Sequence, residues 1–485
     1  MLKYLKIVSL CCSLFACPAL AAPLPEPLAQ ALEKSGFPAS SVALHIAPLD
    51  APGSTIQFNA DVPMKPASVI KVVTTAAALD IFKPNHAWYT DVSARAKPDA
   101  KGTVRGVTLV GGGDPHLMVE RLWLVAERLR AAGVRRIEGS IRVDRSLFDV
   151  PATDPGEFDG APTRTYNVGP DAMMVNLKAV SVTITPEKGT HWATVSAFPP
   201  LDGVRFPAKI RTSAGRCGDW RRSIDARTSD PAHIRFKGRF PAACGPQIWH
   251  ASLWTPDEYL TRLLRYVFKR SGIVWQGRVV PGAAKSDDVL LWREFSEPLS
   301  LVVTWINKYS NNPMARMLFL RLAHAASLHS RNEDKRPVAT LQASRRVLDE
   351  WLVDRVGVAP QSVYVENGSG LSRRTYATAD SLARVLGYMY RQGVMPEFMA
   401  SLPMTGVDGT MRRRPLTSGS AHVKTGFLQD VRSLAGYVTD VRGRRWSIVM
   451  LINDPAPADR DRAFARTVLE WVASGRGDAV RAGGS

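Results

Sequence analysis

The segment PASVIKVVTTAAAL, residues 66–79, contains a serine and a lysine whose spacing could support nucleophilic catalysis. Residues three apart share one face of a helix, so Lys71 would lie beside Ser68. A serine hydroxyl attacks poorly until a base takes its proton, and a lysine can be that base only when it is neutral. Burial among the neighbouring valines and isoleucine would lower the lysine pKa. The alternative is a serine that caps a helix start and a lysine that extends to solvent.

Two further motifs carry side chains that suit the same chemistry. YSNN places Ser310 and Asn312 at a break between helices, and HVKTG places Lys424, Thr425 and Gly426 in a strand. SVIK is the only SxxK in the chain, and KTG also occurs once. Three such motifs in this order are typical of penicillin-recognising serine enzymes. Each motif is weak alone, but the ordered set is unlike a chance match.

The residue types in these motifs predict distinct roles. Lys424 is a second cation that would lower the pKa of Lys71 further. The hydroxyl of Ser310 could relay the proton to the leaving amine, and Asn312 could hold a peptide amide by donating and accepting hydrogen bonds. Lys424 and Thr425 would bind a terminal carboxylate by charge and hydroxyl.

The strand that carries KTG would also align the substrate backbone. Gly426 would let a peptide approach the strand edge and add as another strand. The backbone N–H groups of Ser68 and Phe427 would form an oxyanion hole for the tetrahedral intermediate.

The elements that must position these residues indicate an α+β fold in a chain of 485 residues, long enough for two or three domains. Short alternating strands are expected between about residues 41 and 61, before the Ser68 helix. A Gly- and Pro-rich section of short strands runs from about 91 to 290, and helical periodicity dominates from 299 to 392. Three short strands that include HVKTG predict an antiparallel meander, which a last helix near 459–473 would cover.

The N-terminus and the cysteines indicate export. Lys3 and Lys6 precede a short apolar run and the sequence PALAA, which is typical of a signal peptide cut after Ala21. LFAC faintly resembles a lipoprotein cleavage box, and the apolar run is too short for a membrane span. Outside the signal only Cys217 and Cys244 remain, which favours one disulfide over two unpaired thiols. Two cysteines without further ligands nearby do not make a zinc site, and we expect no metal.

The formal net charge of +19 would suit an anionic partner. An exported protein rarely meets nucleic acid, so an anionic envelope surface or substrate is the favoured interpretation. A basic surface that serves only solubility explains the charge equally well.

Over about residues 59–453 the chain resembles D-alanyl-D-alanine carboxypeptidase/endopeptidases of the penicillin-binding protein 4 type. The resemblance rests on the segments PASVIKVVTTAAAL, LVGGGDPHL, YSNN, NGSGLSR, LPMTGVDGTMRRR and VKTGFLQDVRSLAGY. It implies a periplasmic serine hydrolase without a cofactor, which acts on peptidoglycan stem peptides through an acyl-enzyme and is inhibited by β-lactams. Membrane association would be peripheral at most, and the oligomeric state is left open.

The resemblance also implies a domain plan. A transpeptidase-like domain (residues 22–90 and 291–475) would be interrupted by inserted domains (91–290), the smaller nested near 176–245. Residues 1–21 would be the signal peptide and 476–485 a disordered tail.

The resemblance further implies three substrate contacts. Arg373 and Gln429 would contact the diaminopimelate end of the stem, and Asp144 would bind its amino group. The chain departs from the family at Phe427, where a small hydroxyl residue is usual, and at Asn367, where an aspartate is usual. The first departure removes a side-chain contact to the substrate carboxylate, and the second affects only a supporting hydrogen bond.

Two other functions fit parts of the sequence. A β-lactamase or esterase could use the same site, although no additional carboxylate is evident for activating a deacylating water. A non-catalytic envelope-binding or scaffold protein could retain the fold, although all three motifs are intact.

Overall fold

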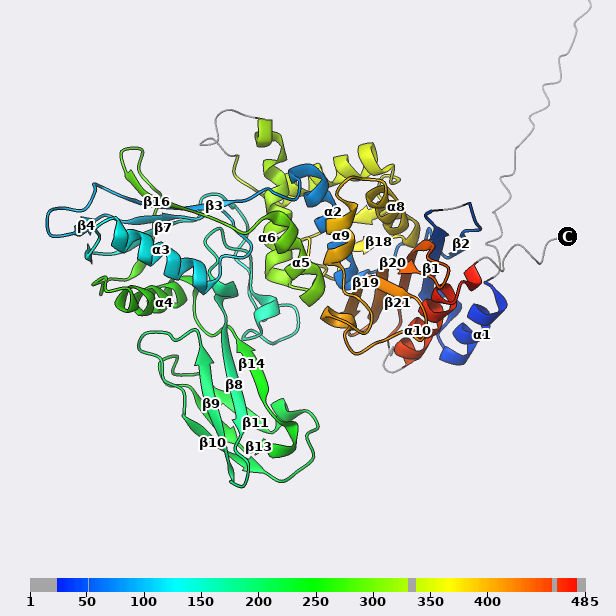
Figure 1. The fold of residues 1–485 in the computed structure, drawn as a ribbon, viewed down its shortest axis with the longest axis horizontal. Coiled ribbons are helices and arrows are strands. Elements are labelled where there is room, and N and C mark those ends of the chain that lie inside the picture. Colours follow the sequence, from blue (N-terminus) through cyan, green and yellow to red (C-terminus); the bar gives the residue numbers. More distant parts are fainter. Residues whose placement is uncertain (1–23, 51, 330–336, 456–459, 478–485) are drawn as a thin grey trace, which may run out of the picture.

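The computed structural model describes residues 24–50, 52–329, 337–455 and 460–477 (Figure 1). The expected signal peptide lies outside the described residues, and so does most of the expected tail. The fold is α+β, as predicted, with sheets and helices distributed over two large lobes and a projecting β-rich arm.

The largest lobe is built on an antiparallel sheet that joins the two ends of the chain. Its strand order is β19-β20-β21-β1-β2. The bounds are β19 (Ser420–Leu428), β20 (Val431–Thr439), β21 (Arg445–Asn453), β1 (Val42–Pro48) and β2 (Ile56–Phe58). The three C-terminal strands form the predicted meander, and β19, which carries KTG, is an edge strand.

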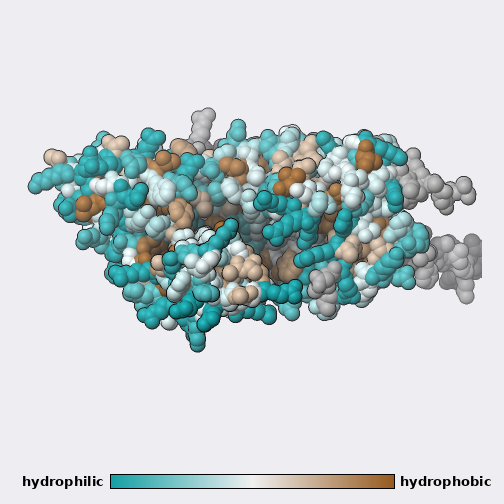
Figure 2. Space-filling model, turned by 60° about the horizontal axis from the view of Figure 1, so that its bottom comes forward, coloured by the Kyte–Doolittle hydropathy of each residue, from teal (hydrophilic) through white to brown (hydrophobic). Residues whose placement is uncertain are grey.

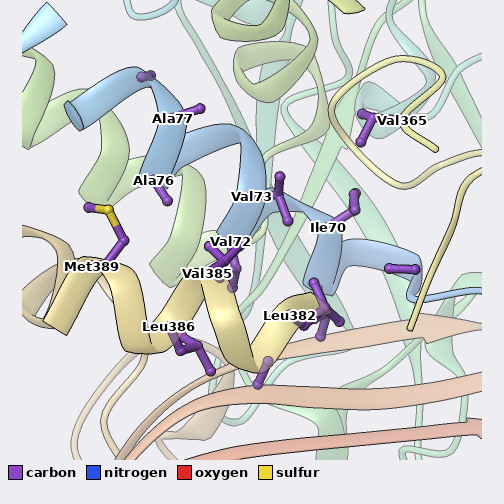
Figure 3. Close-up of a cluster of buried hydrophobic side chains, with 14 of the residues drawn as sticks. Ile70, Val72, Val73, Ala76, Ala77, Val365, Leu382, Val385, Leu386 and Met389 are labelled. Atoms are coloured by element: carbon purple, nitrogen blue, oxygen red, sulfur yellow. The ribbon is translucent and has the colours of Figure 1, made fainter. Parts of the chain in front are cut away.

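Helices cover both faces of this sheet. α1 (Glu26–Ser35) and α10 (Arg460–Ala473) pack on one face, where side chains such as Val423 and Ile448 are buried. α8 (Ala379–Tyr390) packs on the other and separates the sheet from α2 (Lys71–Phe82). Figure 3 shows Val72 and Ala76 of α2 facing apolar side chains of α8. α2 is apolar around nearly its whole circumference, which is typical of a fully buried helix.

The helical part surrounds α2 and supplies the segment around YSNN. It consists of α5 (Leu299–Tyr309), α6 (Asn312–Arg321), α7 (Leu341–Glu350), a π-helical turn (Trp351–Val356) and α9 (Met395–Ser401). The helices predicted between residues 299 and 392 are therefore present. α5 ends at Ser310 in a left-handed conformation and α6 begins at Asn312, so YSNN forms the break between them.

The chain between these parts forms two further sheets. The first has the order β15-β7-β5-β3-β16 and the second β13-β10-β9-β8-β14. The first comprises β3 (Tyr89–Ala94), β5 (Thr108–Val110), β7 (Ile141–Asp144), β15 (Val279–Pro281) and β16 (Val289–Phe295), with α3 (Val119–Ala131) and α4 (Pro256–Arg270) beside it. The second comprises β8 (Val180–Pro186), β9 (Trp192–Phe198), β10 (Lys209–Ser213), β13 (Phe240–Pro241) and β14 (Gln247–Ala251).

The first and last strands of this section pair with each other. Tyr89 of β3 lies opposite Phe295 of β16 in an antiparallel ladder. We therefore propose that residues 89–295 form the inserted domains. The smaller nested domain would extend to the end of β14 at residue 251 rather than to 245, because β14 pairs with β8.

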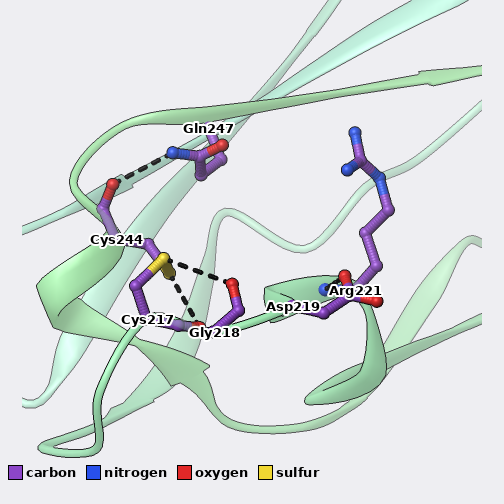
Figure 4. The surroundings of a disulfide bond; sticks show 6 residues. All are labelled: Cys217, Gly218, Asp219, Arg221, Cys244 and Gln247. Atoms are coloured by element: carbon purple, nitrogen blue, oxygen red, sulfur yellow. Dashed lines mark hydrogen bonds between the residues drawn. A yellow bond between two sulfur atoms is a disulfide. The ribbon is translucent and has the colours of Figure 1, made fainter. Parts of the chain in front are cut away.

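The predicted disulfide is confirmed. Cys217 and Cys244 are bonded at the side of the second sheet, 27 residues apart in sequence (Figure 4). Beside it, the side-chain amide of Gln247 donates to the carbonyl of Cys244 at 3.0 Å.

The surface shows no sign of a membrane span in the described chain. None of its helices combines the length and the apolar character needed to cross a bilayer. On the face shown in Figure 2, hydrophilic side chains predominate and apolar ones occur in small patches.

Candidate active site

Ser68 lies in a tight turn rather than at the first position of an α-helix. Residues Ala67–Ile70 form a 3-10 turn, and α2 begins only at Lys71. The Ser68 hydroxyl makes no capping hydrogen bond. It accepts one from Nζ of Lys71 at 2.9 Å. The helix-capping interpretation of Ser68 is therefore wrong. The predicted contact with Lys71 is present, and its catalytic role stays a prediction.

Two glycines let other segments pack tightly against this turn. A Cβ on Gly426 would lie 2.6 Å from the carbonyl oxygen of Pro66, and one on Gly370 would lie 1.9 Å from that of Ala67. The missing side chain of Gly426 therefore lets β19 approach the turn that carries Ser68. That it also admits the substrate stays a prediction.

Lys71 is fully buried and surrounded by hydrogen-bond acceptors. Its Nζ donates to Oγ of Ser68, to Oδ1 of Asn312 at 2.7 Å and to the backbone carbonyl of Ser369. Burial, followed by the nearby charges of Lys424 and Arg316, holds the pKa of Lys71 well below its ordinary value. A neutral amine in this place has a lone pair that can take the Ser68 proton.

Lys424 and Ser310 form a second pair. Nζ of Lys424 donates to Oγ of Ser310 at 3.0 Å and to the backbone carbonyl of Thr425 at 2.6 Å. Lys424 is fully buried, and this burial lowers its pKa to about 7. Ser310 has a positive φ of 56°, which is uncommon for a residue with a side chain. Such strained backbone positions cluster at functional sites.

The structure thus brings the three sequence motifs to one place. Ser310 and Asn312 lie two residues apart, so one helix break contacts Lys424 on one side and Lys71 on the other. Asn312 also donates through Nδ2 to the carbonyl of Tyr166 at 3.2 Å, which connects the inserted section to the cluster. Such an arrangement can deprotonate one hydroxyl and deliver the proton to a leaving group.

The residues that follow Lys424 line the edge of β19. Oγ1 of Thr425 is hydrogen-bonded to Oγ1 of Thr410 at 2.8 Å. Phe427 is 68% exposed, and the guanidinium of Arg432 lies 3.7 Å from its ring centroid. Residues 403–405 pair with the start of the outer edge of β19, where the backbone N–H of Val423 donates to the carbonyl of Pro403 at 2.9 Å. From Thr425 onward this edge has no strand partner in the described residues, so a peptide can add there. The oxyanion hole formed by Ser68 and Phe427 stays a prediction.

Arg373 and Gln429 lie near the hairpin turn between β19 and β20. Arg373 forms an ion pair with Asp430 at 2.9 Å, and Gln429 is the exposed residue beside it. The guanidinium of Arg373 also lies 5.0 Å from the ring centroid of Phe158, which belongs to the inserted section.

Asp144 has no contact with this group of residues. Its carboxylate accepts hydrogen bonds from the backbone and hydroxyl of Ser146 and from the backbone N–H of Ala284. It ends β7 and stabilises a turn within the first inserted sheet. The structure therefore does not place Asp144 where it was expected.

Asp159 is an acidic residue of the inserted section that is linked to the cluster through Tyr166, whose backbone carbonyl accepts from Asn312. It follows Phe158 and accepts hydrogen bonds from Oη of Tyr166 and from Asn167. Burial tends to raise its pKa, but these hydrogen bonds outweigh burial and lower it, so the carboxylate is charged. In the sequence only the aromatic-acid pair in a Gly- and Pro-rich loop marks this residue.

Two other residues support the cluster, and only one of them, Asn367, was identified from the sequence. One is the carbonyl of Ser369, which accepts from Lys71. The other is Asn367, whose Oδ1 accepts from the backbone of Ser369 at 3.0 Å and whose Nδ2 donates to the carbonyl of Leu371 at 2.9 Å. An ionised aspartate could not make the second bond, so the supporting interaction is present with Asn367.

Metal ligation has no evident place in this site. Across residues 24–50, 52–329, 337–455 and 460–477, no group of three or more His, Cys, Asp or Glu side chains could hold an ion.

Comparisons with known proteins give the same picture. The sequence profile of the D-Ala-D-Ala carboxypeptidase 3 (S13) family matches residues 24–473. A D-alanyl-D-alanine carboxypeptidase of Actinomadura sp. (strain R39) is 28% identical over 433 residues, covering 84% of this chain and 77% of the relative. The crystal structure of penicillin binding protein 4 from Haemophilus influenzae superposes with a TM-score of 0.71 at 21% identity, covering 92% of this chain and 99% of that one. The same protein complexed with a β-lactam superposes with a TM-score of 0.67 at 20% identity, with the same coverage.

Proposed function

Because the chain belongs to the D-Ala-D-Ala carboxypeptidase 3 (S13) family and is a serine-type hydrolase, we propose that it cleaves the terminal D-Ala–D-Ala bond of peptidoglycan stem peptides through an acyl-enzyme on Ser68. One observation supports this most directly. Oγ of Ser68 lies 2.9 Å from Nζ of a fully buried lysine, Lys71, whose pKa is lowered.

In the proposed acylation step, neutral Lys71 takes the proton of Ser68 while Oγ forms a bond to the carbonyl carbon of the penultimate residue. The carbonyl oxygen becomes an oxyanion, held by the backbone N–H groups of Ser68 and Phe427. The proton then passes through Ser310 to the amine nitrogen of the last D-alanine, the C–N bond breaks, and D-alanine leaves. Water, deprotonated by the same lysine, hydrolyses the ester and restores Ser68.

Substrate positioning follows from the residues around the cluster. Asn312 would hold a backbone amide of the stem. Lys424 and Thr425 would bind the terminal carboxylate. Arg373 and Gln429 would contact the far end of the stem side chain.

Asp159 is the better candidate for binding the amino group at that end. It adjoins Phe158, which lies under Arg373, and hydrogen bonds keep its carboxylate charged. An acid beside an arginine suits a group that carries both an amine and a carboxylate, as diaminopimelate does.

Three further properties belong to the same proposal. The enzyme would cleave D-Ala–diaminopimelate cross-links as an endopeptidase. It would be acylated by β-lactams, which the β-lactam complex of the Haemophilus influenzae relative supports. It would be exported to the periplasm. Its basic charge would favour the anionic cell wall.

Digestion of isolated peptidoglycan tests this function. We expect mass spectrometry to detect free D-alanine, stems one residue shorter and monomers released from cross-linked dimers. A penicilloyl adduct should decay more slowly than the enzyme turns over a D-Ala–D-Ala peptide, whereas a β-lactamase would show the reverse order. Binding to sacculi without penicillin labelling would instead favour the scaffold function.

The Asp159→Asn variant tests the amine contact. We expect KM for a stem with a free side-chain amine to rise about 10-fold or more, because a charged hydrogen-bond partner is lost. A stem whose amine is acetylated should lose little. Steady-state kinetics on the two stems measures the difference.

Asp154→Asn is the matched control, because Asp154 is an exposed acid of the same loop whose Oδ1 accepts only a local hydrogen bond from Gly156. It should leave both KM values unchanged. An equal loss on the free and acetylated stems in Asp159→Asn would mean that Asp159 only shapes the loop.

A further inference from the structure

A cavity of about 460 Å³ opens beside the KTG strand. Successive side chains of a strand point to opposite faces, and Gly426 faces the turn that carries Ser68. Thr425 and Phe427 therefore face the other way, toward α10, and line the cavity. The remaining walls come from the loop around residues 411–416, from β20 and β21, and from α10 between Asp461 and Leu469.

The cavity combines an apolar floor with a strongly basic wall. The floor consists of Met411, Leu416, Leu434, Met450, Ala465 and Leu469. The charged residues are five arginines and one acid, Arg413, Arg414, Arg432, Arg462, Arg466 and Asp461. Positive charge therefore exceeds negative charge around a concave surface, which attracts anions.

Only part of this charge is compensated within the protein. Arg432 pairs with Asp461 at 3.2 Å, and Arg466 pairs with Glu470 at 3.7 Å. Within the described part of the chain, Arg413, Arg414 and Arg462 are exposed and form no ion pair. These last three guanidinium groups can turn to an incoming anion without breaking an existing pair.

Arg432 connects the cavity to the catalytic strand. It lies opposite Phe427 in the β19–β20 ladder, and its guanidinium covers the Phe427 ring at 3.7 Å. Its Nη1 donates to the carbonyls of Leu428 and Val431 at 2.6 and 2.8 Å, which fixes its position. Arg432 thus places a positive charge beside Phe427. The phenyl ring of Phe427 has no hydroxyl that could bind an anion.

The cavity also lies where a leaving group would go. Lys424 faces Ser310 in the catalytic cluster, and the next residue, Thr425, already lines the cavity. The opposite end of the strand, at Gln429 and Asp430, adjoins Arg373 and the proposed site for the stem side chain. A peptide along the edge of β19 with its scissile bond at Ser68 would therefore send its leaving group past Thr425 toward the arginines.

We propose that this arginine-lined cavity is the leaving-group subsite and that it selects leaving groups that exceed a single alanine in size and carry a further carboxylate besides the one that Lys424 and Thr425 would bind. A free alanine has six heavy atoms and would fill at most about 180 Å³ at the volume of liquid water per heavy atom. A second stem joined through a cross-link would use the cavity more fully. The inference rests on the proposed function, since it assigns a substrate class to the same site.

The double variant R414Q/R462Q tests the inference, because both arginines are exposed and outside any ion pair in the described residues. We expect kcat/KM for a cross-linked dimer with a free leaving-stem carboxylate to fall about 10- to 100-fold. When that carboxylate is amidated, kcat/KM of the wild type for the dimer should be lower than for the free acid. The double variant should change this lower value by less than about twofold. Arg412→Gln is the matched control, because Arg412 is an exposed neighbour that does not line the cavity.

A binding measurement separates this inference from the proposed function. Titration calorimetry on the Ser68→Ala protein should show tighter binding of the free leaving stem as an acid than as an amide, and R414Q/R462Q should remove that preference. Equal binding of acid and amide, or equal loss of kcat/KM on both dimers, would overturn the subsite. Acid preference in a protein that cleaves no stem peptide would overturn the proposed hydrolysis and leave the subsite standing.

Discussion

Replacing Ser68 with alanine is expected to lower stem-peptide hydrolysis by at least about 10⁴-fold and to abolish the covalent β-lactam adduct. The reason is that Ser68 supplies the oxygen that would form the acyl bond, and its hydroxyl is the one hydroxyl among the described hydrogen-bond partners of Nζ of Lys71. Residual turnover would come from the binding groups alone. Release of D-alanine and the intact mass of the protein after incubation with a penicillin measure the two effects.

Loss of folding does not explain such a result if the thermal midpoint is unchanged. The Ser68 hydroxyl caps no helix, and its one described side-chain hydrogen bond is that from Lys71. We therefore expect Ser68→Ala to unfold close to the wild type in the same scan. A penicilloyl adduct that persists in this variant, mapped to another residue by peptide mass spectrometry, would refute the assignment.

Removing the amine in Lys71→Ala is expected to slow acylation by about 10²–10⁴-fold, which is the usual contribution of a general base. Substrate binding should be retained, because the proposed contacts to the stem come from other residues. Lys71→Arg should fare no better, although it keeps a cation, because a guanidinium is not neutral in a protein. Stopped-flow acylation by a chromogenic β-lactam measures the rate.

The lysine at the other end of α2 provides the control. Lys83 is exposed and pairs with Asp80 at 3.2 Å, so Lys83→Gln should acylate at the wild-type rate. Acylation of Lys71→Ala at the wild-type rate would show that the base lies elsewhere.

The two buried lysines, Lys71 and Lys424, determine how activity should depend on pH. A base acts when deprotonated, so activity should rise as pH increases through the lowered pKa of Lys71. Lys424 binds a carboxylate when protonated, so activity on acidic stems should fall as pH increases through its pKa of about 7. In Lys71→Ala the rising limb should disappear and the falling limb should remain.

The meeting of Ser68, Lys71, Ser310, Asn312 and Lys424 could be predicted because these residues lie in short, ordered motifs. Ser68 and Lys71 are three residues apart, and a 3-10 turn followed by an α-helix keeps them adjacent just as a continuous α-helix would. KTG is preceded by an alternation of apolar and polar residues, with Ala421 and Val423 buried, that is typical of a strand. Pro313 marks the break at YSNN. These are local properties, which a sequence shows directly.

Contacts made by irregular segments could not be predicted. Asp144 and Asp159 both lie in the inserted section, and only tertiary packing decides that the segment of Asp159, through its neighbour Phe158, is the one that contacts Arg373. The loop of Asp159 has no periodicity that would fix its direction. The basic cavity was missed for a related reason, since its arginines come from a loop, from β20 and from α10, and each looks like an ordinary surface residue in sequence.

The pairing of β3 with β16 has a consequence for assembly. The residues between Tyr89 and Phe295 leave and re-enter the main lobe side by side. Once they have folded as a unit, Ser68 and Ser310 are separated by tethers of about 20 and 15 residues instead of a loop of about 240 residues. The free-energy cost of closing that loop then falls by about 1.7 kcal/mol. The inserted section thus brings the two parts of the main lobe close together once it has folded, before Ser68 and Ser310 meet.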